Sequence, residues 1–273
     1  MLEIAVVIPT YNRITSIERT VDSVLNQSLA VNEIIIIDDG SNDGTKELIK
    51  TRYPQINYIY QSNKGVSAAR NKGVNKTNCN WIGFLDSDDT WEPNKIEKQI
   101  EAIKNNPNSL ICHTNETWYR NGKILKQQDK HKKYGGHIFS YCLPLCIISP
   151  SSVMIHKRIF NEIGLFDEKL LACEDYDMWL RICCKYPVLF IDETLTNKYG
   201  GHKDQLSKKY WGIDRFRIIA LEKIIKSACL DTEQQNLAID SLLDKVNIFL
   251  KGCEKYGENE YYERFKNIKY QYA

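Results

Sequence analysis

Three aspartates follow an apolar run of the chain within four positions, and their spacing points to chemistry. Asp86, Asp88 and Asp89 come directly after residues 81–85, WIGFL. Carboxylates this close together repel each other, and one of them takes up a proton unless a positive charge lies among them. A divalent metal ion is the first candidate for that charge. An aspartyl nucleophile and an acidic turn that caps the following helix are the alternatives.

The aspartyl nucleophile would belong to a phosphatase. An apolar strand followed by D-x-D-x-T, here Asp86 to Thr90, is similar to the motif of haloacid-dehalogenase-type phosphatases. Those enzymes generally carry it on their first strand, whereas three strand-and-helix units precede it here. No clear lysine and paired-aspartate sequel follows in the expected order, so the pattern favours the metal site. Asp89 is interpreted as an N-terminal charge of a helix that starts near Pro93, where it would favour the helix dipole.

A second acidic pair ends another apolar run, residues 33–37. Asp38 and Asp39 do not start a calcium loop, because Lys50 stands where a bidentate glutamate is required. Either the pair builds a strand-to-helix turn, with a residue of 41–43 capping the helix, or it binds a ligand. A buried carboxylate costs free energy unless it is hydrogen-bonded, and a nucleotide base or ribose could supply those bonds.

One basic side chain is expected close to these carboxylates. Residues 63–74, NKGVSAARNKGV, predict a helix in which Gly65, Ala68 and Ala69 allow close packing against the sheet. Arg70 lies on one face of that helix. Its guanidinium could orient an aspartate or bind a phosphate.

A third acidic group opens an amphipathic helix later in the chain. Helix capping explains one acid there more readily than the three present, Glu174, Asp175 and Asp177. A carboxylate near the metal site could act as a general base on an acceptor hydroxyl. His202 follows two glycines and is a candidate contact for metal or phosphate, with a structural role as the alternative.

The elements that must position these residues alternate between strands and helices. Apolar, β-branched runs at residues 4–8, 33–39, 56–61 and 81–86 are separated by amphipathic stretches. Continuous apolar strands predict a parallel sheet covered on both faces, and therefore an α/β domain. Ligands of such sheets bind at the carboxyl ends of the strands. Those ends carry Pro9-Thr10-Tyr11, Asp38-Asp39-Gly40 and Asp86-Ser87-Asp88.

The pattern changes in the second half of the chain. A hairpin is predicted around Asn121-Gly122, within a mixed region that starts near Ser109. Residues 123–133 are rich in lysine, which indicates either a solvated loop or a contact with an anionic lipid or acceptor. After about Ser207 only helical periodicity remains, which predicts a helical appendage.

Composition excludes some classes of protein. The chain has 273 residues, is 42% hydrophobic and carries a formal charge of +2. Its balance of basic and acidic residues therefore does not predict a nucleic-acid partner. Its nine cysteines form no C-x-x-C pair, and we interpret them as reduced thiols of a cytoplasmic protein. A signal peptide and a membrane span are not expected.

Five motifs in this order resemble the family 2 glycosyltransferases of the GT-A fold. They are VVIPTYNR, IIIIDDGSNDGT, NKGVSAARN, FLDSDD and GLFDEKLLACEDYDMWLR. The resemblance implies a Rossmann-like, mostly parallel sheet with helices on both faces over residues 1–205. Residues 1–108 would form the nucleotide-sugar half and residues 109–205 the acceptor side, with residues 206–273 as a C-terminal helical region.

The resemblance also implies roles for individual residues. Asp175 would be the general base, with Glu174 tuning or orienting it. Asp88 would be the direct ligand of Mn²⁺ or Mg²⁺, with Asp86 and His202 as further candidates. The implied nucleotide-sugar contacts are Pro9, Thr10, Tyr11, Arg13, Asp38, Asp39, Gly40, Lys64, Arg70, Asp86 and Ser87.

The implied reaction is an inverting transfer from a nucleoside-diphosphate sugar, with a UDP-sugar favoured. A saccharide, a lipid-linked glycan or a glycoprotein would be the acceptor, in cell-surface polysaccharide, lipopolysaccharide or glycoconjugate assembly. The expected location is the cytoplasm, with peripheral contact to the inner face of the membrane. The alternatives are a phosphoryl-transfer enzyme that uses Asp86 and Asp88, and an inactive sugar-nucleotide-binding protein.

Overall fold

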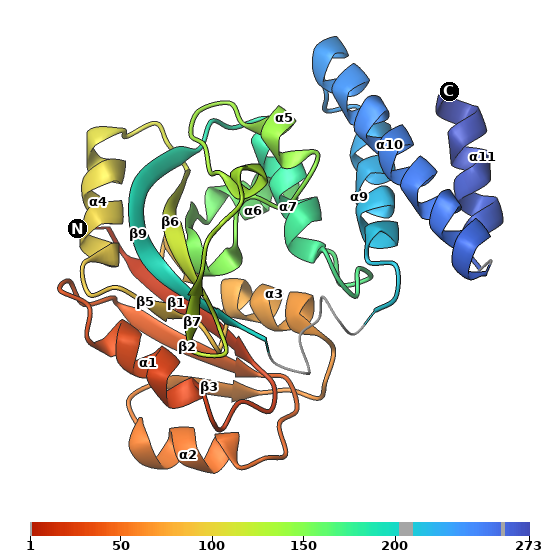
Figure 1. Cartoon of the computed structure of the whole chain (residues 1–273). Coiled ribbons are helices and arrows are strands. Elements are labelled where there is room, and N and C mark those ends of the chain that lie inside the picture. The colour runs from red at the N-terminus through yellow and green to blue at the C-terminus, as the bar shows by residue number, and fades with distance from the viewer. Residues whose placement is uncertain (1, 202–209, 258–259) are drawn as a thin grey trace.

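The computed structural model describes residues 2–201, 210–257 and 260–273, and in them a curled sheet is covered by helices (Figure 1). The strands of this sheet run in the order β3-β2-β1-β4-β8-β6-β9-β5, and β7 pairs with β6. The strands are β1 (Ile4–Thr10), β2 (Glu33–Asp38), β3 (Asn57–Tyr60), β4 (Trp81–Phe84), β5 (Thr90–Trp91), β6 (Ile111–Arg120), β7 (Lys123–Leu125), β8 (Val153–His156) and β9 (Leu189–Gly200). The helices are α1 (Ile17–Leu25), α2 (Thr45–Arg52), α3 (Val66–Lys76), α4 (Lys95–Asn105), α5 (Phe139–Cys142), α6 (Arg158–Ile163), α7 (Glu174–Cys183), α9 (Asp214–Lys226), α10 (Thr232–Tyr256) and α11 (Tyr262–Tyr272).

The first four strands form the parallel part of the sheet, as their continuous apolar sequences predict. β1 pairs in parallel with β2 and β4, and β2 pairs in parallel with β3. All seven residues of β1 are buried. Ile4, Val6 and Ile8 pack in one core with α1, α2 and α4, whereas Val7 packs in the other core, on the α3 side. Burial on both faces explains why polar residues appear only where the strands end.

α3 packs close to the sheet, as expected, but through a different glycine. A Cβ atom added to Gly73 would lie 2.3 Å from Cγ1 of Val7, so only glycine fits there. A Cβ atom added to Gly65 would meet nothing within 4 Å, and Gly65 instead has a φ of +91°, which glycine adopts without strain. The prediction that Gly65 is a packing residue is therefore wrong. Ala69 is buried against β2, as predicted.

The Asn121-Gly122 hairpin is confirmed. β6 and β7 pair in antiparallel fashion on either side of these two residues, and both have positive φ, which fits the two-residue turn favoured between twisted strands. Within the lysine-rich segment that follows, Lys133 is buried and its Nζ lies 3.2 Å from Oε1 of Glu116. Lys133 therefore does not belong to a solvated loop. A lipid or acceptor contact stays a prediction for the exposed lysines of residues 123–132.

The C-terminal residues are helical in the described part of the chain, as predicted, and they extend a core instead of standing apart from it. α10 begins with a capping box in which Asp231 and Gln234 exchange side-chain and backbone hydrogen bonds. Leu221 of α9 and Leu242 of α10 belong to the same buried cluster as Trp179 of α7. Figure 1 shows α9, α10 and α11 beyond α5 and α7, on the side away from β3. The exact boundary near residue 205 lies outside the described residues and stays a prediction.

Two further expectations concern cysteines and membranes. The nine cysteines form no disulfide and five of them are buried, whereas their reduced state in the cell stays a prediction. Among the described residues no helix combines the length and apolarity that crossing a bilayer requires.

A buried lysine gives the fold a measurable pH dependence. Burial lowers the pKa of Lys95 from 10.5 to about 7, while its Nζ donates to Oε1 of Gln99 at 2.7 Å. Between pH 7 and 10.5 the unfolded chain holds this proton and the folded chain does not, so the free energy of unfolding should rise with pH by up to about 1.4 kcal/mol per unit. Below about pH 7 both states are protonated and this dependence ends.

Urea denaturation at pH 7, 8 and 9 tests this expectation in wild type and Lys95→Met. Methionine removes the titrating group and keeps the apolar stem, so the difference between the two stability curves isolates Lys95. The free energy of unfolding of wild type should rise relative to that of Lys95→Met as the pH rises from 7 to 9. Parallel curves would show that Lys95 keeps its ordinary pKa.

Candidate active site

A cavity of about 1030 Å³ opens at the carboxyl ends of β1, β2 and β4. It is the place where the sequence predicts convergence of polar strand ends. Ten of the expected site residues line it: Pro9, Thr10, Tyr11, Arg13, Asp39, Lys64, Arg70, Asp86, Ser87 and Asp88. Asp38, Gly40, Glu174 and Asp175 are not lining residues, and His202 lies outside the described residues.

The two aspartates after β2 have different tasks. Oδ1 of Asp38 accepts a hydrogen bond from the backbone N–H of Ser41 at 2.7 Å, and its Oδ2 accepts from the Tyr58 hydroxyl. Burial, together with this bond, raises the pKa of Tyr58 above its ordinary value. Asp38 is completely buried, so it holds the turn and does not line the cavity, and a contact with the nucleotide stays a prediction.

Asp39 faces the cavity and arranges the loop before α3. Its Oδ1 accepts from the backbone N–H of Lys64 at 2.9 Å and its Oδ2 from that of Gly65 at 2.8 Å. Gly40, with a φ of +94°, turns the chain away directly after it. The prediction of a helix cap at residues 41–43 is wrong, because the N-cap of α2 is Gly44, which has no side chain to accept a bond. Asp43 precedes it, and its Oδ1 accepts from the backbone N–H of Thr45 at 3.1 Å.

Arg70 connects two acidic motifs that lie far apart in the sequence. Its Nη2 lies 2.8 Å from Oδ1 of Asp86, and its Nη1 lies 2.6 Å from Oε1 of Glu174. Burial lowers the pKa of Arg70, but the two carboxylates outweigh burial and keep it charged. Arg70 therefore pairs with one acid of each motif, and a contact with phosphate stays a prediction.

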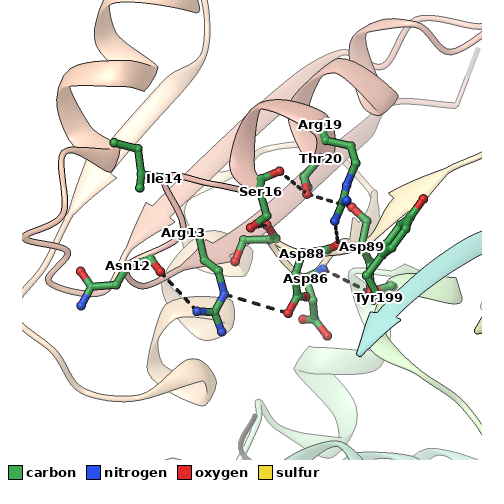
Figure 2. A network of polar contacts seen from close by, with 12 residues as sticks. Asn12, Arg13, Ile14, Ser16, Arg19, Thr20, Asp86, Asp88, Asp89 and Tyr199 are labelled. Atoms are coloured by element: carbon green, nitrogen blue, oxygen red, sulfur yellow. Dashed lines mark hydrogen bonds and ion pairs between the residues drawn. The ribbon is translucent and has the colours of Figure 1, made fainter. Parts of the chain in front are cut away.

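The three carboxylates after β4, labelled in Figure 2, all line the cavity but differ in burial. Asp86 and Asp88 line the cavity, and Oδ2 of Asp88 lies 4.0 Å from Nε of Arg13. Asp89 is only 3% exposed. It accepts from Oγ of Ser151 at 2.6 Å and from the backbone N–H of Tyr199 at 3.0 Å. Burial raises the pKa of Asp89 well above its ordinary value, and neighbouring Lys198 opposes this effect.

The interpretation of Asp89 as a helix-terminal charge is therefore wrong. α4 begins at Lys95, six residues further on, and Asp89 instead joins β9 to the segment before β8. A sequence shows an acid close to a helix start, but it does not show which strand will pack over that acid.

The cavity carboxylates suit a divalent cation that is shared with a substrate. Among residues 2–201, 210–257 and 260–273 no three acidic, histidine or cysteine side chains are close enough to enclose a metal ion. Asp86 and Asp88 offer hard oxygen ligands from one wall of the cavity. Mg²⁺ is usually held in this way, by one or two carboxylates together with phosphate oxygens of a substrate. The residues present fit such an ion and do not form a closed protein cage.

The acidic group at the start of α7 also divides by task. Glu174 binds Arg70, whereas Asp177 is buried and lies 2.8 Å from Nη2 of Arg181 and 2.9 Å from Nζ of Lys223, which joins α7 to α9. Asp175 is half-buried, and its Oδ1 accepts from the backbone N–H of Tyr176 at 2.7 Å. Glu174 thus pairs with Arg70 and Asp177 holds the fold, whereas Asp175 follows Glu174 in the chain and does not line the cavity.

Several lining residues were not predicted. Lys198 and Tyr199 of β9 reach the cavity, as do Glu168, Leu170, Leu171 and Tyr210 from the chain around α7. Burial lowers the pKa of Lys198, but Glu116, Asp89, Asp86 and Asp175 together raise it above the ordinary value. One weak signal was visible in the sequence, a lysine and a tyrosine at the end of a strand. It could not show that β9 lies parallel to β6 and ends at this cavity.

Comparison with known proteins identifies the family. The model of the family described as glycosyl transferase family 2 matches residues 5–164, more than half of the chain. The chain is a family 2 glycosyltransferase. This membership removes the phosphatase alternative for Asp86 and Asp88.

Relatives and solved structures agree with this assignment. The glycosyltransferase is 34% identical over 209 residues to an uncharacterized glycosyltransferase of Rickettsia bellii, which covers 76% of this chain. It is 32% identical over 201 residues to a chondroitin synthase of Escherichia coli, which covers 71% of this chain. The chain spans 28% of the length of each of these two relatives.

The fold resembles that of TarS from S. aureus. The crystal structure of TarS 1–349 in complex with UDP-GlcNAc has a TM-score of 0.76, with 18% sequence identity over 98% of this chain and 79% of that one. The glycosyltransferase therefore has the GT-A fold with additional C-terminal helices, as expected from the resemblance of its motifs.

Proposed function

We propose that this glycosyltransferase transfers a sugar from a UDP-sugar to a hydroxyl of a saccharide acceptor, with inversion at the anomeric carbon. The observation that carries the proposal is the bridge through Arg70. It connects Asp86, in the wall of a cavity that also contains Asp39 and Asp88, to Glu174, the neighbour of Asp175. Donor-side and acceptor-side carboxylates are thereby held at one site.

Each residue has a defined task in this proposal. Asp39 shapes the nucleotide end of the cavity through Lys64 and Gly65, and Asp86 and Asp88 would hold Mn²⁺ or Mg²⁺. When bound, the ion supplies positive charge for the diphosphate leaving group. Asp175 accepts the proton of the acceptor hydroxyl as it attacks. A single displacement with one base inverts the configuration.

Two comparisons support the choice of substrates. TarS was crystallised with UDP-GlcNAc, which favours a UDP-sugar as donor. The similarity to a chondroitin synthase favours a growing polysaccharide as acceptor, and thus a role in assembly of a cell-surface glycan. The donated sugar would be a hexose or an N-acetylhexosamine.

Donor binding with and without metal tests the proposal directly. UDP should raise the melting temperature more in the presence of Mn²⁺ than in excess chelator, because a ligand that binds only the folded state stabilises it. GDP and dTDP serve as matched nucleotides, and Asp88→Ala should remove the Mn²⁺ dependence. Metal-dependent binding without any transfer to saccharide acceptors would favour the inactive sugar-nucleotide-binding protein instead.

Replacement of Asp39 should weaken nucleotide binding. Asp39→Ala removes the acceptor of the backbone N–H groups of Lys64 and Gly65, which holds the loop before α3, and each such hydrogen bond contributes about 0.5–1.5 kcal/mol. We expect at least a tenfold loss of UDP affinity by calorimetry. Asp43→Ala is the control, because Asp43 accepts bonds from Ile14 and Thr45 in the same turn but does not line the cavity. Equal affinities in Asp39→Ala and wild type would remove Asp39 from the nucleotide site.

A further inference from the structure

Helix α1 holds the loop that carries Asp86 and Asp88. Three consecutive carbonyl oxygens of this loop accept hydrogen bonds from α1 and its first flanking residue. Oγ of Ser16 donates to Ser87 at 2.9 Å, Nη2 of Arg19 donates to Asp88 at 2.7 Å, and Oγ1 of Thr20 donates to Asp89 at 2.8 Å.

The spacing of the three donors explains how one helix can hold a whole loop. Positions 16, 19 and 20 are separated by three and four residues, so their side chains share one face of a helix. The fixed carbonyls are those of successive peptide units. The loop therefore cannot rotate its peptides without breaking bonds to α1, and the side-chain directions of Asp86 and Asp88 follow from that backbone.

Arg19 differs from the other two donors because it makes a second contact across the site (Figure 2). Its guanidinium carbon lies 3.8 Å from the centre of the Tyr199 ring. That ring stacks on Tyr119 with 4.9 Å between centroids and 14° between planes. The backbone N–H of Tyr199 in turn donates to Oδ1 of Asp89. Arg19 thus connects α1, the carboxylate loop and the end of β9.

The position of Arg19 outside the cavity wall indicates what it can do. Arg19 is exposed and does not line the cavity, whereas Asp88 and Tyr199 both do. Arg19 therefore acts on a ligand through these two residues. A planar guanidinium can donate to a carbonyl in its own plane while its face covers an aromatic ring, and a lysine ammonium cannot do both.

We propose that Arg19 is a positioning residue of the donor site, which holds the carbonyl of Asp88 and the ring of Tyr199 so that Asp88 is correctly placed for a divalent metal and a nucleoside diphosphate. The inference rests on the proposed function, because it assumes that the cavity binds these ligands.

Metal-dependent binding of UDP provides a test that does not need turnover. The Mn²⁺ concentration that gives half of the maximal UDP-induced thermal shift is compared in wild type, Arg19→Ala, Arg19→Lys and Tyr199→Leu. We expect Arg19→Ala to raise this concentration about tenfold or more, the factor that loss of one charge-assisted hydrogen bond produces. Arg19→Lys should not restore the wild-type value, although it keeps the charge.

The remaining variants separate positioning from other roles. Arg52→Gln is the matched control and should behave as wild type. Arg52 is an exposed arginine of α2 that pairs with Glu18, the neighbour of Arg19 on α1, and neither residue of this pair lines the cavity. Unfolding in the absence of ligand should be unchanged in Arg19→Ala. If the two side chains act together, the loss of binding free energy in the double variant Arg19→Ala/Tyr199→Leu should be smaller than the sum of the losses in the two single variants.

Three results would overturn the inference. Arg19→Ala with the wild-type Mn²⁺ requirement would show that the loop is positioned without Arg19. Full recovery in Arg19→Lys would show that only the positive charge matters. A wild-type protein that binds UDP neither with nor without Mn²⁺ would overturn the proposed function as well, and that failure is seen before any variant is compared.

Discussion

Asp175→Asn will lose transfer and keep donor binding. Oδ1 of Asp175 accepts a bond from the backbone N–H of Tyr176, and the carboxylate also accepts from the thiol of Cys146, whose pKa is raised by burial and by Asp175. The amide oxygen of asparagine can accept such bonds too. The substitution is nearly isosteric and changes the capacity to take a proton. Loss of a positioned base costs about 10²- to 10⁴-fold in rate, and this loss should appear in the chemical step instead of in donor affinity.

Calorimetry with UDP and product release in a transfer assay, on the same preparations, test this expectation. Asp177→Asn is the control on the same helix, since Asp177 pairs with Arg181 and Lys223. Its replacement should lower stability and leave transfer per folded molecule close to wild type. If Asp175→Asn also loses metal-dependent UDP binding, Asp175 belongs to the metal site. If Glu174→Gln alone abolishes transfer while Asp175→Asn is active, the base is Glu174.

The second large effect is expected at Arg70, and it combines stability with activity. Arg70→Ala leaves Glu174 without its charge partner in a site where burial already raises the pKa of Glu174. Removal of one partner from a buried ion pair typically costs about 3–5 kcal/mol. The orientation of Asp86 is lost at the same time, so transfer should fall even where the protein remains folded.

Urea denaturation and transfer assays on three variants distinguish these contributions. Arg70→Lys keeps the charge but cannot reach two acids in the fixed geometry of a guanidinium, so it should recover part of the stability and little of the activity. Arg70→Met/Glu174→Gln removes both charges and should be more stable than Arg70→Ala, because no charge is left buried alone. A loss below about 1 kcal/mol in Arg70→Ala would contradict a buried bridge.

The sequence by itself determined the parallel half of the fold and the strand ends that face the cavity. β1, β2 and β4 are short and almost continuously apolar, and such strands must be covered on both faces. Their first polar residues therefore mark the places where the chain leaves the sheet, and these include Asp39, Asp86 and Asp88. The Asn121-Gly122 turn was predictable for a similar local reason, since its residues adopt positive φ readily.

The tertiary structure decided the role of each acid, although several of these acids look equivalent in the sequence. Asp38 and Asp39 are neighbours, yet one is completely buried against Ser41 and Tyr58 and the other lines the cavity. Asp88 and Asp89 are also neighbours and both line the cavity, yet of the two only Asp89 is buried, where the backbone of Tyr199 in β9 packs over it. Local sequence fixes the presence of a carboxylate but not the burial that sets its charge and partners.

Contacts between distant segments were out of reach of the sequence for the same reason. Arg70 and Glu174 are 104 positions apart and Arg19 and Asp88 are 69 apart, and no local periodicity relates such pairs. Their hydrogen bonds form only after the sheet and its helices have packed, because packing brings the segments within reach and removes the water that would compete for the same groups. The sequence determined where the chemistry lies along the chain, and the packed fold decided how it is held.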